Sequence, residues 1–268
     1  MSLLRTQQLS LQQRDRLLVE QLSFEIRAGQ CWVVLGTNGS GKSTLLKTLA
    51  GVQASTSGEV WLNDVQCQSL SPRQRAQQVG LIFQHSHLGF HSSALEMVLS
   101  GGFAQRSAWG FESPEEIAQA TQALQAVGLQ ALAEQPLESL SGGELRRAEI
   151  ARLLVQSPKL AMLDEPLNHL DLAQQVTMLQ LLRKHFCNTE HALLMVLHDI
   201  NLALHTASHL LLLKGDGNWQ AGRVQELGNA ETLSATLGFP LRRIDTPHGS
   251  ALELDFEQTG LAQPPARE

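Results

Sequence analysis

A glycine-rich segment between an apolar run and a helical pattern constrains the fold of this chain most. The apolar run occupies residues 31–35, and the segment after it reads Gly36, Thr37, Asn38, Gly39, Ser40, Gly41, Lys42, Ser43 and Thr44. This order matches Gly-x-x-x-x-Gly-Lys-Ser/Thr, the loop that binds phosphates at a helix N-terminus. Its three glycines allow positive φ and close backbone approach, so that successive N–H groups converge on an anion. The pattern predicts a nucleotide-binding core in which the whole segment contacts the ligand.

Two side chains of this segment have a specific chemistry. Lys42 is placed to reach the β- and γ-phosphates of a nucleotide, and the Ser43 hydroxyl is placed to ligate Mg²⁺. The alternative is a glycine-rich turn that contains a lysine by chance. That alternative does not explain why a strand, a loop and a helix follow in the required order.

Composition limits the class of protein. The chain has 268 residues, enough for one large α/β core with a subdomain but not for two nucleotide cassettes. Its net charge of −6 gives no support to a nucleic-acid partner. The three cysteines are far apart, which argues against a disulfide framework or a zinc site and agrees with a reducing cytoplasm. No signal peptide and no run of about 18 apolar residues occurs, so we expect contact with a membrane only through proteins that span it.

The apolar patterns predict two sheets. Short strands between residues 3 and 26, around a polar turn at residues 12–15, and at residues 58–62 predict a small antiparallel sheet. Apolar runs typical of buried parallel strands lie at residues 31–35, 79–83, 160–163, 192–197 and 210–213. Because helical patterns separate these runs, we expect an α/β fold with a mainly parallel sheet and helices on both faces.

A helical subdomain is expected at about residues 85–158, where no strand pattern occurs. One helix begins there with Ser113 as N-cap and Glu116 as its capping-box partner, and Gly128 stops it. Its apolar stripe is expected at Ile117, Ala120, Leu124 and Val127. After the core we expect a helix from residue 229 and a hairpin at residues 244–256. Residues 1–256 would then form one domain, followed by a tail at residues 257–268.

Two acidic residues follow the apolar run at residues 160–163. Asp164 belongs at the carboxyl end of this strand, beside the Mg²⁺ of a phosphate-loop protein. Glu165 is placed to polarise a water in line with the γ-phosphate. A solvated turn also explains a pair of acids taken alone, but the upstream phosphate loop favours the catalytic interpretation. We expect Asp164 in the metal site and Glu165 as the general base.

The sequence Leu-Ser-Gly-Gly-Glu precedes a helix that runs to about residue 155. Ser141 and Glu144 have the spacing of a local capping box. A capping box does not explain Gly142 and Gly143, because a glycine in a helix costs about 1 kcal/mol relative to alanine. A helix N-terminus without side chains suits close contact with a phosphate, so we expect all of Ser141, Gly142 and Gly143 to bind one.

With these motifs the chain resembles the ATP-binding cassette ATPases of membrane transporters, over roughly residues 3–256. The Leu-Ser-Gly-Gly-Glu signature is specific to that family among phosphate-loop proteins. The resemblance implies ATP and Mg²⁺ as cofactors. It also implies that two copies pair head to tail, so that the signature of one copy grips the γ-phosphate held by the phosphate loop of the other. A single subunit would then be nearly inactive.

The resemblance assigns roles to three further residues. Gln84 is similar to the glutamine that touches Mg²⁺ and the attacking water, although a polar strand end also explains it. His198 is similar to the switch histidine that contacts the γ-phosphate, and a structural histidine is the alternative. Asp171 fits the loop that crosses the dimer interface, and helix capping explains it equally. The resemblance thus implies Glu165, His198, Gln84 and Lys42 as catalytic residues and Ser43, Gln84 and Asp164 as the metal site.

Some residues depart from the family pattern. Such cassettes commonly stack adenine on an aromatic residue between the first two strands, but this chain has no tyrosine. Arg14 or Arg16 is a candidate to stack its guanidinium on the base instead. Leu167 and His169 replace the small residues common after the catalytic glutamate, from which we expect altered contacts rather than lost catalysis.

Three histidines, His85, His87 and His91, follow the glutamine. They are close enough in sequence for a metal site. No carboxylate or cysteine completes a plausible set of ligands, so we favour a polar loop that faces a partner.

The resemblance implies an ATP-hydrolysing subunit that drives a separate transmembrane permease from the cytoplasmic face of the membrane, with a substrate-binding protein as an indirect partner. Residues 198–203 and 238–243 are similar to cassettes of importers for metal chelates such as ferric siderophores, haem and cobalamin. Residues 98–101 also occur in molybdate-type cassettes. The alternative is a soluble cassette ATPase that acts on ribosomes or DNA, but the chain lacks both a second cassette and a long coiled-coil insertion.

Overall fold

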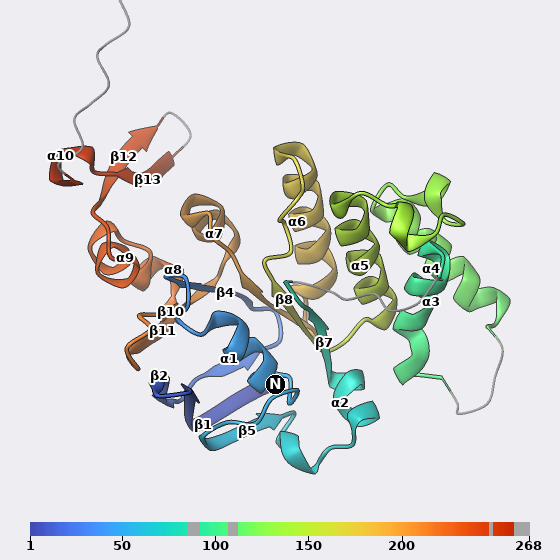
Figure 1. The fold of residues 1–268 in the computed structure, drawn as a ribbon, viewed down its shortest axis with the longest axis horizontal. Helices are drawn as coiled ribbons and strands as arrows, with labels where there is room; N and C mark the ends of the chain where they lie inside the picture. The colour runs from blue at the N-terminus through green and yellow to red at the C-terminus, as the bar shows by residue number, and fades with distance from the viewer. Residues whose placement is uncertain (85–91, 107–111, 247–248, 260–268) are drawn as a thin grey trace, which may run out of the picture.

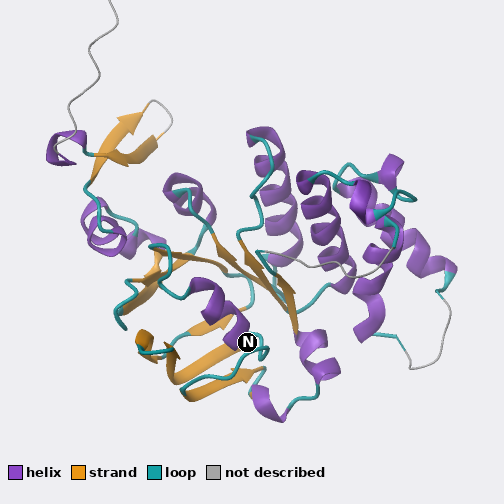
Figure 2. Cartoon of the chain, viewed as in Figure 1, coloured by secondary structure: helices purple, strands orange, loops and turns teal. Residues whose placement is uncertain are grey.

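The chain forms a central sheet with different layers on its two faces. In the computed structural model, residues 1–84, 92–106, 112–246 and 249–259 are described. Figure 1 shows α1 (Lys42–Leu49) and an antiparallel sheet on one face of the central sheet. The helices α5 (Gly142–Gln156), α6 (Leu172–Phe186) and α7 (Ile200–Thr206) cover the other face. Figure 2 makes the same division visible by secondary structure, since most helices lie to one side of the central sheet.

The central sheet has six strands in the order β11-β10-β4-β9-β8-β7. Their bounds are β4 (Cys31–Gly36), β7 (Val79–Ile82), β8 (Leu160–Asp164), β9 (Ala192–Val196), β10 (His209–Leu213) and β11 (Trp219–Arg223). All neighbours pair in parallel except β11, which pairs antiparallel with β10. The expected α/β fold and all five predicted parallel strands are confirmed.

Each parallel strand buries both of its faces. In β4, Cys31, Val33 and Leu35 pack among the helices of one layer, while Trp32 and Val34 pack against α1 and the antiparallel sheet. Because successive side chains point to opposite faces, a strand covered on both sides must be apolar at nearly every position. This is why these strands are continuous apolar runs in the sequence.

The antiparallel sheet contains the N-terminus. Its strands are β1 (Ser2–Gln13), β2 (Arg16–Leu22), β3 (Glu25–Arg27), β5 (Ser57–Leu62) and β6 (Val65–Gln66). The predicted turn at residues 12–15 is shorter than expected, because Gln12 and Gln13 pair with β2. Only Arg14 and Asp15 form the turn, and Arg14 takes a φ of +54°.

The expected helical subdomain consists of helices wherever it is described. It contains α3 (Ala94–Leu99), α4 (Pro114–Ala126) and α5, with short 3₁₀ turns at residues 100–104, 130–132 and 137–139. Ser113 caps α4 and shares a capping box with Glu116, as predicted. The predicted apolar stripe is wrong at Ile117, which is 42% exposed. The buried face of α4 is centred on Ala120, Ala123, Leu124 and Val127, and the first turn lies at its edge.

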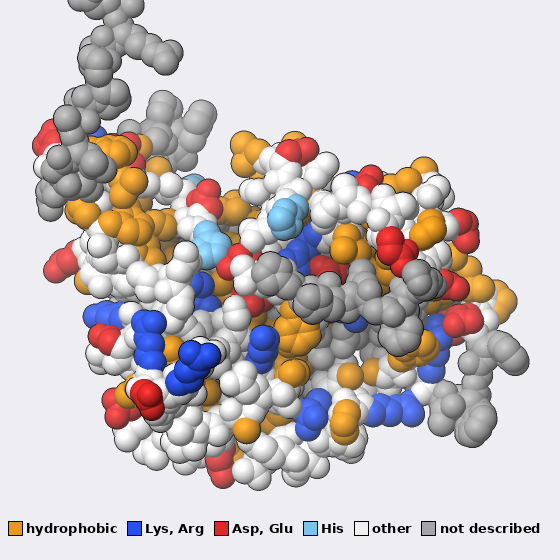
Figure 3. All heavy atoms as spheres, viewed as in Figure 1, with side chains coloured by type: hydrophobic (Ala, Val, Ile, Leu, Met, Phe, Trp, Pro, Cys, Tyr) orange, Lys and Arg blue, Asp and Glu red, His pale blue; other side chains and the backbone are white. Residues whose placement is uncertain are grey.

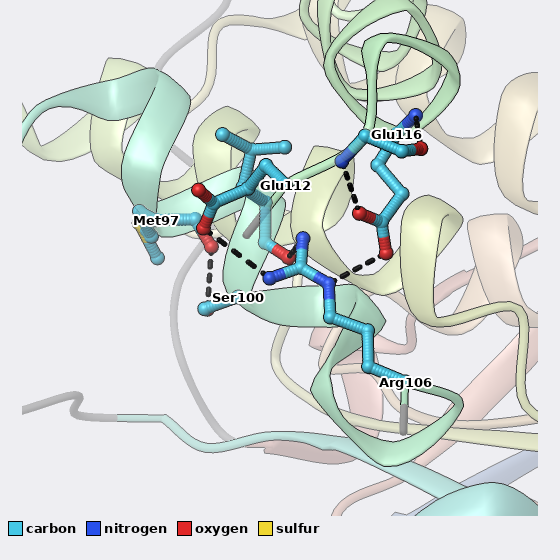
Figure 4. A network of polar contacts seen from close by, with 7 residues as sticks. Met97, Ser100, Arg106, Glu112 and Glu116 are labelled. Atoms are coloured by element: carbon cyan, nitrogen blue, oxygen red, sulfur yellow. Dashed lines mark hydrogen bonds and ion pairs between the residues drawn. The ribbon is translucent and has the colours of Figure 1, made fainter. Parts of the chain in front are cut away.

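An ion-pair network joins two parts of this subdomain. The Nε of Arg106 lies 2.6 Å from Oε1 of Glu116, and its Nη1 lies 3.3 Å from Oε1 of Glu112 (Figure 4). The Arg106 side chain is 13% exposed, so the pair with Glu116 is partly shielded from solvent. These contacts fasten the turn after α3 to the start of α4.

The C-terminal part lies beside α7. It comprises α8 (Val224–Leu227), α9 (Ala230–Leu237), β12 (Leu241–Thr246), β13 (Gly249–Leu254) and α10 (Phe256–Thr259). Elsewhere in the chain, α2 (Pro72–Gln78) connects the antiparallel sheet to β7 in sequence. The hairpin starts at Leu241, earlier than the predicted residue 244, because residues 241–243 already pair with residues 252–254 of β13. Arg242 and Glu253 also form an ion pair across it at 2.7 Å. Asn201 of α7 exchanges two 2.9 Å hydrogen bonds with the backbone of Leu252. Residues 257–259, the described part of the predicted tail, are helical.

We predict that Phe186→Ala lowers the free energy of unfolding by about 3–5 kcal/mol, because the fully buried ring at the end of α6 leaves a cavity. Urea unfolding of the nucleotide-free protein, followed by circular dichroism, measures this. Leu172→Ala in the same helix is the control: Leu172 is 76% exposed, so a change within about 0.5 kcal/mol is expected. Equal losses in the two variants would contradict the burial of Phe186.

Candidate functional site

The phosphate loop connects β4 to α1 and contains two left-handed positions. Gly39 has φ +75° and Gly41, the N-cap of α1, has φ +98°. Both positions favour glycine because a Cβ is strained there. Gly36 does not take a positive φ. Gly36 is needed for close approach, since a Cβ on it would lie 2.4 Å from the carbonyl oxygen of Leu213.

Lys42 is the first residue of α1 and points back over the loop. Its Nζ donates 2.9 Å hydrogen bonds to the carbonyl oxygens of Gly36 and Thr37. Burial lowers the pKa of Lys42, and the negative charges of Glu165 and Asp164 oppose that shift. The ammonium is therefore held at the mouth of the loop, where a phosphate would replace the two carbonyls as its partner.

A cavity of 570 Å³ opens beside the loop. It is lined by Gln13, Asn38, Gly39, Gly41, Lys42, Ser43, Thr44, Gln84, Glu165 and His198. The structure therefore brings most of the predicted loop residues together with the predicted catalytic residues. Gly36 and Thr37 line a neighbouring cavity of 260 Å³ instead, and Ser40 is fully buried. Figure 3 shows basic side chains over α1 and β2 on this side of the molecule, which suits an anion despite the net charge of −6.

Asp164 ends β8 and has the chemistry of a cation ligand. It is 3% exposed, and its Oδ1 is buried without a hydrogen-bond partner. Burial raises the pKa of Asp164, while the hydroxyl of Ser43 opposes the shift by hydrogen bonding to it. An unpartnered buried carboxylate oxygen beside a hydroxyl fits Mg²⁺, which prefers oxygen ligands. The residues present therefore fit the predicted metal site.

Glu165 lies at the centre of the site, with a φ of +52°. Its Oε2 accepts hydrogen bonds from Nε2 of Gln84 at 2.9 Å and from Nδ2 of Asn168 at 2.6 Å. Its Oε1 accepts one from Nε2 of His198 at 2.6 Å. Burial acts to raise the pKa of Glu165, but these hydrogen bonds outweigh it and hold the pKa below its ordinary value. The carboxylate is thus kept ionised and oriented by donors from three segments.

A buried arginine that the sequence analysis did not single out supports this arrangement. Arg146 of α5 is 4% exposed and pairs with Glu149 at 2.7 Å. Its guanidinium also donates to the carbonyl oxygens of Phe83, Gln84 and Glu165 at 2.9, 3.3 and 3.2 Å. It therefore joins the ends of β7 and β8 to the helical subdomain. The sequence offered one indication of this role: an arginine on the buried side of a predicted helix needs polar partners inside the protein.

The signature residues lie outside the 570 Å³ cavity. Ser141 caps α5 and shares a capping box with Glu144. Gly143 has a packing reason that the sequence did not show: a Cβ there would lie 2.8 Å from the carbonyl oxygen of His169. At Gly142 a Cβ would meet only the His169 ring at 3.6 Å, an ordinary contact. Local packing therefore explains why residue 143 is glycine, but it does not explain why residue 142 is glycine.

Further positions singled out in the sequence have distinct surroundings in the structure. The guanidinium of Arg16 lies beside Gly39 and donates to the carbonyl oxygen of Gly215 at 2.9 Å. Arg14 lies in the turn, and both arginines are exposed. Asp171 caps α6 by accepting from the backbone of Gln174 at 2.8 Å. Leu167 is buried, and His169 is exposed with a φ of +68°.

His85, His87 and His91 lie outside the described residues. Among the residues that the structure describes, no group of three or more His, Cys, Asp or Glu side chains is arranged to hold a metal ion. Within the same residues, no helix combines the length and apolar character needed to cross a bilayer.

Comparisons with known proteins agree with these motifs. A family model described as ABC transporter matches residues 19–168. The ferric enterobactin transport ATP-binding protein FepC of Escherichia coli K12 is 34% identical over 91% of this chain and 90% of its own length. The hemin import ATP-binding protein HmuV of Hahella chejuensis is 39% identical over 85% and 87%. A solved inward-facing metal-chelate type ABC transporter has a TM-score of 0.80 at 28% identity, over 94% of this chain and 96% of that one.

We predict that Lys42→Ala weakens nucleotide binding by about 10- to 100-fold, because it removes about 1.5–3 kcal/mol of charge-assisted hydrogen bonding. Calorimetric titration with ATP measures this. Lys47→Ala is the matched control, since Lys47 lies in the same helix over the ring of Phe83 at 5.8 Å. Unchanged binding by Lys42→Ala would remove the phosphate-loop assignment.

Proposed function

From the premise that this chain is an ATPase of the ABC transporter family, we propose that it drives a metal-chelate importer. It would pair with a second copy around two Mg-ATP and power a separate permease. The observation that supports this most is the split of the site: phosphate loop, Glu165 and His198 share one cavity, while the signature lies outside it. We propose residues 1–256 as a single ATPase domain, with residues 85–158 as its helical subdomain.

In the proposed pair, each ATP lies between two copies. Lys42 and the loop amides of one copy hold the phosphates, and Ser141, Gly142 and Gly143 of the other copy contact the γ-phosphate. The lack of a packing reason for Gly142 supports this arrangement, since a bare helix N-terminus lets backbone N–H groups approach an anion. Asp171 caps α6 through its Oδ1 and, in this proposal, also faces the partner.

The residues around the cavity have distinct roles in the proposed reaction. Glu165 accepts the proton of the attacking water, and its lowered pKa keeps it ionised for that task. Gln84 and His198 orient this carboxylate and the water beside it. Ser43, Asp164 and Gln84 would hold Mg²⁺, which when bound neutralises charge on the phosphate oxygens. Lys42 stabilises the same charge from the loop side. Arg16, fixed beside Gly39, is our choice over Arg14 for contact with the base.

The cargo and partners are inferred from the relatives. Ferric enterobactin and hemin are the cargoes in the names of two relatives, and the solved neighbour is of the metal-chelate type. We therefore propose a ferric siderophore, haem or cobalamin as cargo, a substrate-binding protein that delivers it, and a peripheral position on the cytoplasmic face of the membrane. The permease would dock between core and helical subdomain, near residues 84–90, of which only Gln84 is described.

Trapping experiments test the paired site. We predict that Glu165→Gln binds ATP, forms a stable dimer and stops turnover, because the amide cannot accept the proton. Size-exclusion chromatography with light scattering measures the dimer. Adding Gly142→Asp is the matched control, since the site has room for a side chain but the carboxylate would repel the partner's phosphate. That double variant should stay folded, bind ATP and remain monomeric. An ATP-trapped dimer of the double variant would contradict the role of the signature.

Co-purification separates the proposed function from its alternatives. The tagged chain, isolated from detergent-solubilised membranes of its native host, should bring down a multi-span permease encoded near it. Addition of the cargo-loaded binding protein to that complex in liposomes should raise the ATPase rate. Stimulation by a molybdate-loaded protein would support the molybdate-type alternative. Isolation with ribosomes or DNA and without a permease would support the soluble cassette.

A further inference from the structure

Asn168, in the loop after β8, makes a close hydrogen bond to the carboxylate of Glu165. Its Nδ2 lies 2.6 Å from Oε2 of Glu165, which is shorter than the 2.9 Å contact from Gln84 to the same oxygen. The residue belongs to the loop between β8 and α6, and its side chain is half-buried. Because an ionised carboxylate only accepts hydrogen bonds, the amide group of Asn168 must face it with the NH₂ side.

The donors around Glu165 are distributed unequally. Oε2 accepts from both Gln84 and Asn168, while Oε1 accepts from His198 alone. An ionised carboxylate offers about four lone-pair positions, two on each oxygen. Both positions of Oε2 are therefore occupied, and the remaining one belongs to Oε1. Glu165 and His198 both line the cavity, so this free position is available to a water there.

The backbone of the loop does not need the Asn168 side chain to keep its course. Gln175 of α6 donates from Nε2 to the carbonyl oxygens of Leu167 and Leu170, at 3.4 and 3.1 Å. Leu167 and Leu170 are themselves buried in the core. The amide of Asn168 is directed at the carboxylate instead, and Glu165 is the side-chain partner that the structure gives it.

We propose that Asn168 is a positioning residue for ATP hydrolysis: its amide saturates Oε2 of Glu165 and so leaves Oε1 as the oxygen that accepts the proton of the attacking water. This inference rests on the proposed role of Glu165 as the base. It adds a residue that does not line the 570 Å³ cavity and that acts through the carboxylate.

The test compares three variants that keep or remove the donor. Asn168→Ala loses it, and kcat should fall by about 100-fold, the loss typical of a reacting group misplaced by about 1 Å. Asn168→Ser keeps a donor and should recover much of the rate. Asn168→Asp keeps the shape but presents a negative charge to Glu165, so it should be the slowest. The KM and the ATP dissociation constant should stay within about twofold in all three, because the residue acts on the reaction rather than on binding.

The matched control is Gln175→Ala, which loosens the same loop without touching the carboxylate. It should retain kcat. A purely structural role for Asn168 would instead let Gln175→Ala lower kcat as much as Asn168→Ala. That result overturns the proposal, as does a wild-type kcat for Asn168→Ala.

A double-mutant cycle separates this inference from the proposed function. In a Glu165→Gln background, in which turnover has already stopped, Asn168→Ala should leave ATP binding and the ATP-trapped dimer unchanged, because both changes act through one group. If Glu165→Gln alone hydrolyses ATP at the wild-type rate, Glu165 is not the base and both proposals fail. If Glu165→Gln is inactive but Asn168→Ala is fully active, only the role of Asn168 fails.

Discussion

The parallel pairing of β4, β9, β8 and β7 is the constraint on which the site depends. It brings the carboxyl ends of four strands to one edge of the sheet, so residues distant in sequence meet there. The phosphate loop follows β4, Gln84 follows β7, Glu165 follows β8 and His198 follows β9. The strands owe this arrangement to burial on both faces, which selects continuous apolar runs and requires helices on one side and a second sheet on the other.

Much of this architecture could be predicted from the sequence. The apolar runs located all five parallel strands, and the capping box at Ser113 located the start of α4. Local rules suffice at such positions because an apolar run and a capping box are each visible in a short stretch of sequence. Boundaries were less predictable. Gln12 and Gln13 continue β1 because they pair with β2, and cross-strand pairing is not visible in a local pattern.

Site residues that belong to a sequence motif could be predicted. Site residues whose role depends on tertiary contacts could not. The phosphate loop and the acids after β8 were found from their spacing. The support from Arg146 and the contact from Asn168 depend on which segments meet in the fold. Gly143 illustrates the same limit, since its need for a bare Cα comes from the carbonyl of His169, 26 positions further along the chain. The low helix propensity of glycine suggested that Gly142 and Gly143 both contact a ligand. Packing against His169 accounts for Gly143 without one.

The contact between Gly143 and the His169 carbonyl leaves no room for a side chain between two segments. One segment is the start of α5, and the other is the loop that also contains Glu165 and Asn168. Because the two backbones are packed this closely, a displacement of one segment toward the other must move both. In the proposed pair, α5 serves one nucleotide while the loop serves the other. The two ATP molecules would then be linked mechanically through this backbone contact, beside the Arg146 side chain that also joins α5 to the loop.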